Sequence, residues 1–131
     1  MKKRENLSSG AVWEDKVGYS RAVKVDDIIE ISGTTAVNGS EVVAVGNPYA
    51  QTKFIIEKFS SILEEAGSSL KDIVRVRIYV CDITDWEKVG KAFYEYFKDI
   101  KPAATMIEVN SLIDPQLLVE MEATAIITKS S

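Results

Sequence analysis

Lys101–Thr128 reads KPAATMIEVNSLIDPQLLVEMEATAIIT, and the rest of the chain is organised around this stretch. Its pattern predicts two strands, at residues 105–109 and 118–127, joined by a polar connection. On the second strand one face carries Glu120, Glu122 and Thr124, and the other carries Val119, Met121 and Ala123. A buried carboxylate is costly unless it is paired or hydrogen-bonded. The two acids therefore mark these strands as the place to look for a functional site.

The preceding sequence predicts further strands and two helices. Alternating residues indicate strands at residues 19–25, 28–32, 41–45 and 74–80. Asn47 and Pro48 are suited to the start of a first amphipathic helix, which Gly67 ends. A second helix begins at Thr84 or Asp85 and ends before the proline at position 102.

This order of elements predicts an α+β fold in one domain, residues 1–131. One mixed six-stranded sheet, with two helices packed on one face, accommodates all of the predicted elements. Residues 1–17 are expected to form an irregular N-terminal arm that Trp13 and Val17 hold against the body. Because both helices cover one face, the other face is expected to be apolar and to be covered by self-association.

Composition excludes several classes of function. The net charge of −4 argues against a nucleic-acid partner, which favours a basic face. The absence of histidine excludes histidine-based triads and histidine metal sites, and the single Cys81 cannot form an internal disulfide. No apolar run is long enough to cross a bilayer, and no secretory core follows the basic N-terminus, so we expect no membrane partner and a cytoplasmic location.

Five stretches, taken in this order, resemble the Rid family, also called YjgF-like or endoribonuclease L-PSP-like proteins. The resemblance runs from about Tyr19 to Ile127. The stretches are GYSRA at residues 18–22, ISG at 31–33, VRIYV at 76–80, KPAAT at 101–105 and VEMEA at 119–123.

The resemblance implies a chorismate-mutase-like fold that forms a homotrimer through the open face of the sheet. It also implies clefts at the subunit interfaces, each holding a small-molecule ligand. In the best-known branch these clefts hydrolyse enamines and imines such as 2-aminoacrylate to a 2-keto acid and ammonia. No metal or other cofactor takes part in that reaction.

Several residues correspond to those of the active branch. The resemblance assigns substrate-binding positions to Tyr19, Gly33 and Thr105, and it assigns to Glu120 the catalytic role of positioning the attacking water. Where that branch reads Pro-Ala-Arg, with the arginine binding the substrate carboxylate, this chain has Ala104 as the third residue. Alanine cannot form a bidentate, charge-assisted contact with a carboxylate, so the standard reaction does not carry over to this chain directly.

Arg21 is the candidate replacement for this arginine, and Gly90 is a second departure from the deaminase branch. Arg21 follows Tyr19 by two residues, so it either binds the substrate in place of the arginine or pairs with Glu120 or Glu122. In the second helix, Gly90 stands where the deaminase branch tends to have asparagine.

Two functional hypotheses follow. The first is a hydrolase of an imine-like or enamine-like metabolite that uses Glu120. The second is a trimer that binds a small metabolite without turnover. A ribonuclease activity, which is attributed to some relatives, is disfavoured by the acidic charge and the lack of histidine.

Overall fold

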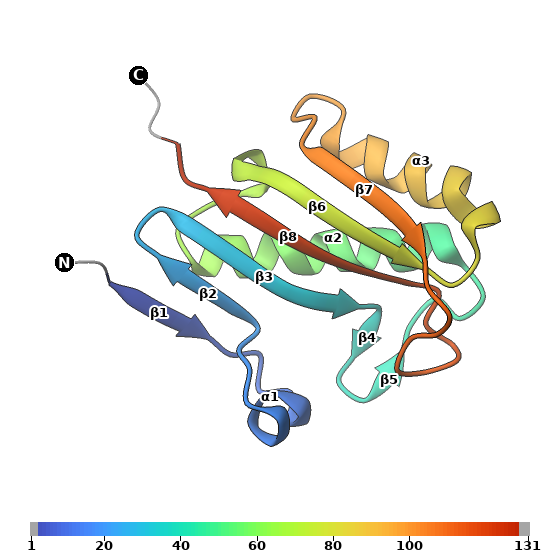
Figure 1. Cartoon of the computed structure of the whole chain (residues 1–131), viewed down its shortest axis with the longest axis horizontal. Coiled ribbons are helices and arrows are strands. Elements are labelled where there is room, and N and C mark those ends of the chain that lie inside the picture. The colour runs from blue at the N-terminus through green and yellow to red at the C-terminus, as the bar shows by residue number, and fades with distance from the viewer. Residues whose placement is uncertain (1–2, 129–131) are drawn as a thin grey trace.

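The computed structural model describes residues 3–128 and has a mixed sheet of six strands in the order β1-β2-β3-β8-β6-β7 (Figure 1). β6 and β7 are parallel, and the other neighbouring strands are antiparallel. These strands are β1 (Arg4–Leu7), β2 (Ala22–Val25), β3 (Ile28–Thr35), β6 (Ile73–Val80), β7 (Ala103–Glu108) and β8 (Val119–Ile126). The other elements are α1 (Val12–Val17), β4 (Val37–Asn38), β5 (Glu41–Val42), α2 (Pro48–Glu65), α3 (Trp86–Phe97) and the 3₁₀ turns η1 (Leu70–Asp72) and η2 (Ile83–Asp85). The predicted α+β class is confirmed.

The sheet differs from the prediction in one strand. The strand expected at residues 41–45 contributes only β5, which pairs with β4 in a separate two-stranded sheet. The sixth strand of the main sheet is instead β1, which pairs with β2. β1 is short and polar, and its partner lies fifteen or more residues away in the register Arg4↔Val25 to Leu7↔Ala22, so the local pattern gives little sign of it.

The expectation of an irregular arm is therefore wrong for the described part of residues 1–17. Besides β1, this segment forms the short helix α1. Trp13 and Val17 do not hold it to the body, because they are 56% and 69% exposed. The buried residue of α1 is Glu14, which is only 4% exposed. Hydrogen bonds to this carboxylate hold α1, while β1 is held by its pairing with β2 and by the buried Leu7.

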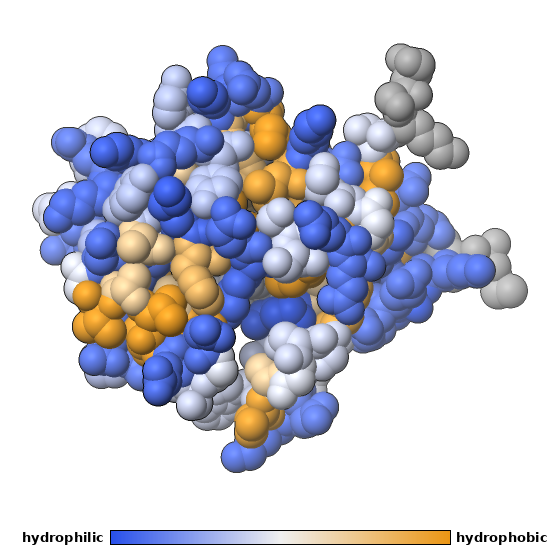
Figure 2. Space-filling model, turned by 180° about the vertical axis from the view of Figure 1, so that it is seen from behind, coloured by the Kyte–Doolittle hydropathy of each residue, from blue (hydrophilic) through white to orange (hydrophobic). Residues whose placement is uncertain are grey.

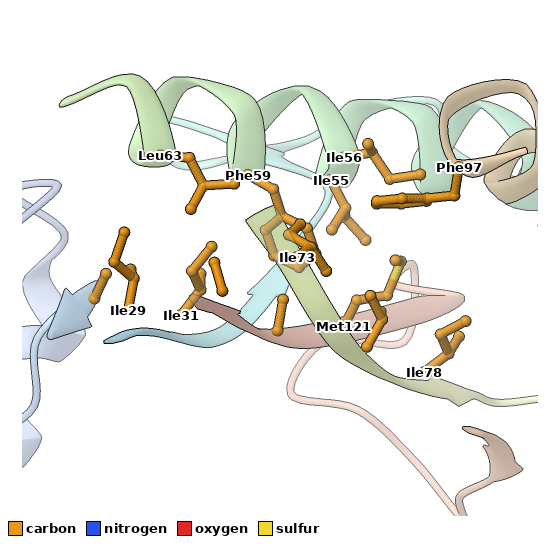
Figure 3. Packing of buried hydrophobic residues seen from close by; sticks show 14 of the residues in the cluster. Ile29, Ile31, Ile55, Ile56, Phe59, Leu63, Ile73, Ile78, Phe97 and Met121 are labelled. Atoms are coloured by element: carbon orange, nitrogen blue, oxygen red, sulfur yellow. The ribbon is translucent and has the colours of Figure 1, made fainter. Parts of the chain in front are cut away.

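The hydrophobic core lies between the sheet and the helices (Figure 3). Asn47 caps α2 by accepting a hydrogen bond from the Ala50 amide at 3.0 Å. Ile55, Phe59 and Leu63 then project from α2 towards the sheet. The inward residues of β8 are Val119, Met121, Ala123 and Ala125, and each is at most 2% exposed. The predicted alternation of β8 is thus confirmed, and it orients Glu120 away from the core.

The face of the sheet without helices is largely polar, contrary to the expected apolar face. Residues of β6 and β8 on this face are Arg75, Arg77, Tyr79, Glu120, Glu122, Thr124 and Ile126, and the neighbouring strands add the exposed isoleucines Ile28 and Ile107. The period of two places most apolar residues of both strands under the helices and leaves the charged ones on the open face. Seen from the helix side, the surface is mostly hydrophilic, with hydrophobic groups gathered in limited patches (Figure 2). In residues 3–128, no helix has both the length and the apolar character needed to cross a membrane.

Candidate functional site

The candidate site is centred on Glu120, which projects from the middle of the sheet. Its strand neighbours are Thr35 on β3 and Tyr79 on β6. The Glu120 carboxylate lies directly against Gly33, because a Cβ atom built on that glycine would be 2.1 Å from Oε2. Gly33 occupies a shift in the register of β3, between Ile31 and Thr34. A side chain at position 33 would displace the carboxylate, so the bulge and the glycine together position Glu120.

Arg21 lies beside the same bulge. Its Nη2 donates a hydrogen bond to the Gly33 carbonyl at 2.6 Å, and its guanidinium carbon is 5.9 Å from the centre of the Tyr19 ring. Its Nε is buried and has no hydrogen-bond partner among residues 3–128. A buried donor without a partner is costly, so Arg21 is held at this place at some cost in stability. Tyr19, Arg21, Gly33 and Glu120 are therefore close together, and we call them the Glu120 group.

The predicted alternative, in which Arg21 pairs with an acid, is not what the structure has. In the described part of the chain no nitrogen of Arg21 lies within 4.0 Å of either Glu120 or Glu122. Glu122 instead accepts a hydrogen bond from the Tyr79 hydroxyl, and its Oε2 lies 3.9 Å from Nη1 of Arg77. The acid at position 122 is thus held by β6, which leaves Arg21 available beside Glu120.

Burial is the main reason why the pKa of Glu120 is raised above its ordinary value of 4.5. The nearby Arg21 acts in the opposite direction, and the like charge of Glu122 adds to the increase. A carboxyl group with a raised pKa exchanges protons closer to neutral pH than an ordinary glutamate does. The raised pKa makes Glu120 a candidate for a general base or acid.

Lys58 is a neighbour whose place near the site the sequence did not predict. Its Nζ donates to the Thr35 carbonyl at 3.3 Å. Burial lowers the pKa of Lys58, and repulsion by Arg21 lowers it further. The sequence signal is a lysine beside the apolar stripe of α2, and a lysine in such a place ordinarily extends its ammonium group to solvent.

Tyr19 is positioned by the segment that the sequence left unstructured. The backbone carbonyl of Glu14 accepts hydrogen bonds from the Gly18 and Tyr19 amides at 2.9 and 3.0 Å. The Glu14 carboxylate accepts further bonds from the Ser8 hydroxyl at 2.9 Å and the Ser9 amide at 3.2 Å. Burial alone would raise the pKa of Glu14, but the bonds from Ser9 and Ser8 outweigh it, so the pKa is lowered. Glu14 thereby connects residues 8–10 to the residue that enters the site.

Ala104 and Thr105 lie elsewhere, on the edge strand β7. Ala104 is opposite Val76 of β6, and Thr105 is opposite Arg77. Nη2 of Arg75 donates to the Thr105 hydroxyl at 2.7 Å, beside a hollow of about 230 Å³ on the open face. Since β6 separates β7 from β8, two strand spacings of about 4.8 Å place the β7 edge roughly 10 Å from the backbone of Glu120. Within one chain the predicted site residues therefore form two separate groups.

Metal-binding side chains do not gather at either group. Residues 3–128 contain no cluster of three or more histidine, cysteine, aspartate or glutamate side chains placed to hold a metal ion.

Comparisons with known proteins agree with this fold and these motifs. The family model described as Endoribonuclease L-PSP matches residues 13–127. A RutC family protein of Pyrococcus abyssi is 41% identical over 109 residues, covering 82% of this chain and 84% of the relative. The 3-aminoacrylate deaminase RutC of Acinetobacter baylyi is 34% identical over 108 residues, covering 82% and 85%. A crystal structure from Mycobacterium tuberculosis, of a YjgF/YER057c/UK114 family member, superimposes with a TM-score of 0.87 at 40% identity, covering 95% of this chain and 100% of the other. The chain therefore belongs to the Rid/YjgF family, the family that the endoribonuclease L-PSP model describes.

Proposed function

We propose that this protein hydrolyses a small imine or enamine that carries a carboxylate. The observation on which the proposal rests is the Glu120 carboxyl, which is partly buried, has a raised pKa and is held against Gly33 next to Arg21. A relative at 34% identity is named a 3-aminoacrylate deaminase, which makes 3-aminoacrylate the first substrate to try.

The reaction needs one group that can accept and return a proton. An enamine first becomes an imine by moving a proton from nitrogen to carbon. As the water oxygen bonds to the C=N carbon, the carboxylate of Glu120 accepts a water proton and passes it to the nitrogen. The remaining hydroxyl proton then moves to the nitrogen while the C–N bond breaks, which releases ammonia and leaves a carbonyl group.

Arg21 is the cation that we assign to the substrate carboxylate. Its Nη2 is engaged by Gly33, but its Nε–H has no partner in the described residues. A carboxylate bound at the guanidinium of Arg21 would gain a charge-assisted hydrogen bond. It would also lie next to Glu120, where the C=N carbon must be placed.

We further propose that the complete cleft forms between subunits of a homotrimer. The Glu120 group and the β7 edge, with Ala104 and Thr105, are too far apart to contact one ligand within a chain. Assembly that placed the β7 edge of one subunit against the Glu120 group of the next would join them. The polar open face, with Arg77 and Glu122, would then supply charged contacts between subunits.

The test is release of ammonia from freshly generated 3-aminoacrylate, 2-aminoacrylate and 2-iminobutyrate. We expect turnover of at least one substrate, with loss of at least 100-fold in Glu120→Gln, the order of magnitude for general acid–base catalysis. Glu64→Gln is the control, because it removes the same charge from an exposed position on α2 that belongs to neither group. Light scattering on the same samples reports the assembly. No turnover of any substrate by a trimer would refute the hydrolase proposal, and a monomer would refute the cleft.

One observation favours a second candidate function, a trimer that binds a metabolite without turnover. Ala104 is exposed at the β7 edge and offers no functional group to a substrate. A thermal-shift screen with keto acids and amino acids distinguishes this function, because a ligand of the native state raises Tm even when nothing is hydrolysed.

A further inference from the structure

A groove along α3 has no role in the hydrolysis proposed above. Its volume is about 370 Å³, within the range of small-molecule sites. Phe97 is buried, Phe93 is partly buried, and their ring centres are 4.5 Å apart. The side chain of Tyr94 is 65% exposed and adds a further aromatic surface. The residues that line this α3 groove include Gly90, Phe93, Tyr94, Phe97, Lys98 and Lys101.

Gly90 contradicts the local preference of the helix. Glycine in a helix interior is less stable than alanine, because the unfolded chain loses more conformational freedom. Packing does not require glycine here, since nothing lies within 4 Å of a Cβ built at this position. Its backbone φ is also not among the positive values that favour glycine. Gly90 leaves its end of the α3 groove without a side chain.

Lys101 shows the reverse case, because it is a residue other than glycine at a position where glycine is preferred. It has a φ of 51°, in the left-handed region that glycine adopts most readily at the ends of helices. Its amide donates to the Phe97 carbonyl at 2.8 Å, which closes the C-terminal turn. A lysine at this position is strained where a glycine would not be, and the ammonium group that it supplies borders the α3 groove.

The groove also carries two lysine ammonium groups that form no salt bridge within the described residues. They belong to Lys98 and Lys101, which are both exposed. Gly90 and Lys101 each depart from the residue that their backbone position prefers, and both border the same groove. Such departures are typical of functional sites. Aromatic walls and lysine ammonium groups together suit a ligand with an apolar body and an anionic end.

We propose that the α3 groove binds a small monocarboxylate with an aromatic or branched apolar body. Its apolar body contacts Phe93, Tyr94 and Phe97, and its carboxylate interacts with Lys101 and Lys98. This inference goes beyond the proposed hydrolysis and does not depend on it, because Glu120 takes no part.

The probe is 3-phenylpropanoate, titrated by calorimetry into the whole chain in the same state of assembly that light scattering reports. We expect saturable binding of one molecule per chain. Propanoate lacks the apolar body and 3-phenylpropan-1-ol lacks the charge, so each should bind at least tenfold more weakly. Failure of 3-phenylpropanoate to bind at millimolar concentration, or equal binding of the alcohol, would overturn the proposal.

Two variants separate a binding role from a structural one. Gly90→Leu places a large side chain in the groove and Lys101→Gly removes one of its two cations, and each should weaken binding at least tenfold. Both should also raise Tm by a few degrees, because each restores the locally preferred residue. Lys88→Gln, an exposed lysine of α3 outside the groove, should change neither quantity. Unchanged affinity in both variants would overturn the proposal. So would a change in oligomeric state, which would identify the groove as a contact between copies of the chain.

Discussion

Substitution of Gly33 by alanine tests whether the position of the Glu120 carboxylate governs activity. The added Cβ would lie 2.1 Å from Oε2, whereas ordinary van der Waals contact begins at 3.4 Å. The carboxylate oxygen must therefore retreat by more than about 1 Å. The backbone can accommodate alanine, because Gly33 does not adopt a positive φ. The substitution thus moves one functional group and leaves the fold intact.

A displacement of 1 Å at a reacting group can cost on the order of 100-fold in rate. We therefore expect kcat of Gly33→Ala to fall about 100-fold, which corresponds to about 2.7 kcal/mol of transition-state stabilisation. Stability should be unchanged or slightly higher, because alanine restricts the unfolded chain more than glycine does. The assay is ammonia release from the preferred substrate, with Tm measured on the same samples.

A double-mutant cycle with Glu120→Gln identifies the cause. If Gly33→Ala acts by displacing the carboxylate, adding it to Glu120→Gln should produce little further loss. Full activity in Gly33→Ala would refute the reasoning about geometry. A 100-fold loss that persists in the Glu120→Gln background would refute the reasoning about mechanism, because the glycine would then act on something other than Glu120.

Three further predictions concern the anchor, the acid and the N-terminal segment. Ala104→Arg should gain ammonia release from 2-aminoacrylate, measured against the wild type at equal trimer concentration. Glu120→Gln should become more stable than the wild type in urea as the pH rises from 4.5 through the raised pKa of Glu120. The reason is that the folded wild type holds this proton more tightly than the unfolded chain does, so losing it costs stability. Each unit of pKa difference is worth about 1.4 kcal/mol. Glu14→Gln should lose about 1–3 kcal/mol at neutral pH, since its lowered pKa stabilises the fold above the unfolded value, and this difference should vanish in acid as the folded Glu14 becomes protonated.

The sequence predicts the sheet where strands are long and alternate, and it fails where pairing is distant. β6 and β8 each have eight residues with a clear apolar face, and both were predicted. β1 has four residues, of which only Leu7 is buried, and its stability comes from pairing with β2. No local pattern indicates such a strand. The prediction of an apolar open face failed for a different reason. The alternation of β6 already indicates that its open side is polar, but the prediction for the whole sheet did not use this.

The site could be predicted in part. The motifs identified Tyr19, Arg21, Gly33 and Glu120, and the structure brings these four together. Their contacts could not be predicted, because the bulge at Gly33 decides which atom meets the carboxylate. The support given by Glu14 was also missed, since a buried acid that is satisfied by nearby serines has no simple sequence signature.

The position of Ala104 decides what an arginine introduced there can do. Ala104 is paired with Val76, a fully buried residue on the helix side of the sheet, whereas Glu120 projects from the open side. In the register of the sheet Ala104 is in line with Ala123, three residues along β8 from Glu120, so an arginine at position 104 would begin about 14 Å from Glu120 and on the other side of the sheet of its own chain. A gain of activity in Ala104→Arg would therefore require the Glu120 group of a neighbouring subunit. That gain should disappear when the protein is diluted until light scattering shows monomers. Activity that survives such dilution would show that the two groups act within one chain, contrary to the geometry of the sheet.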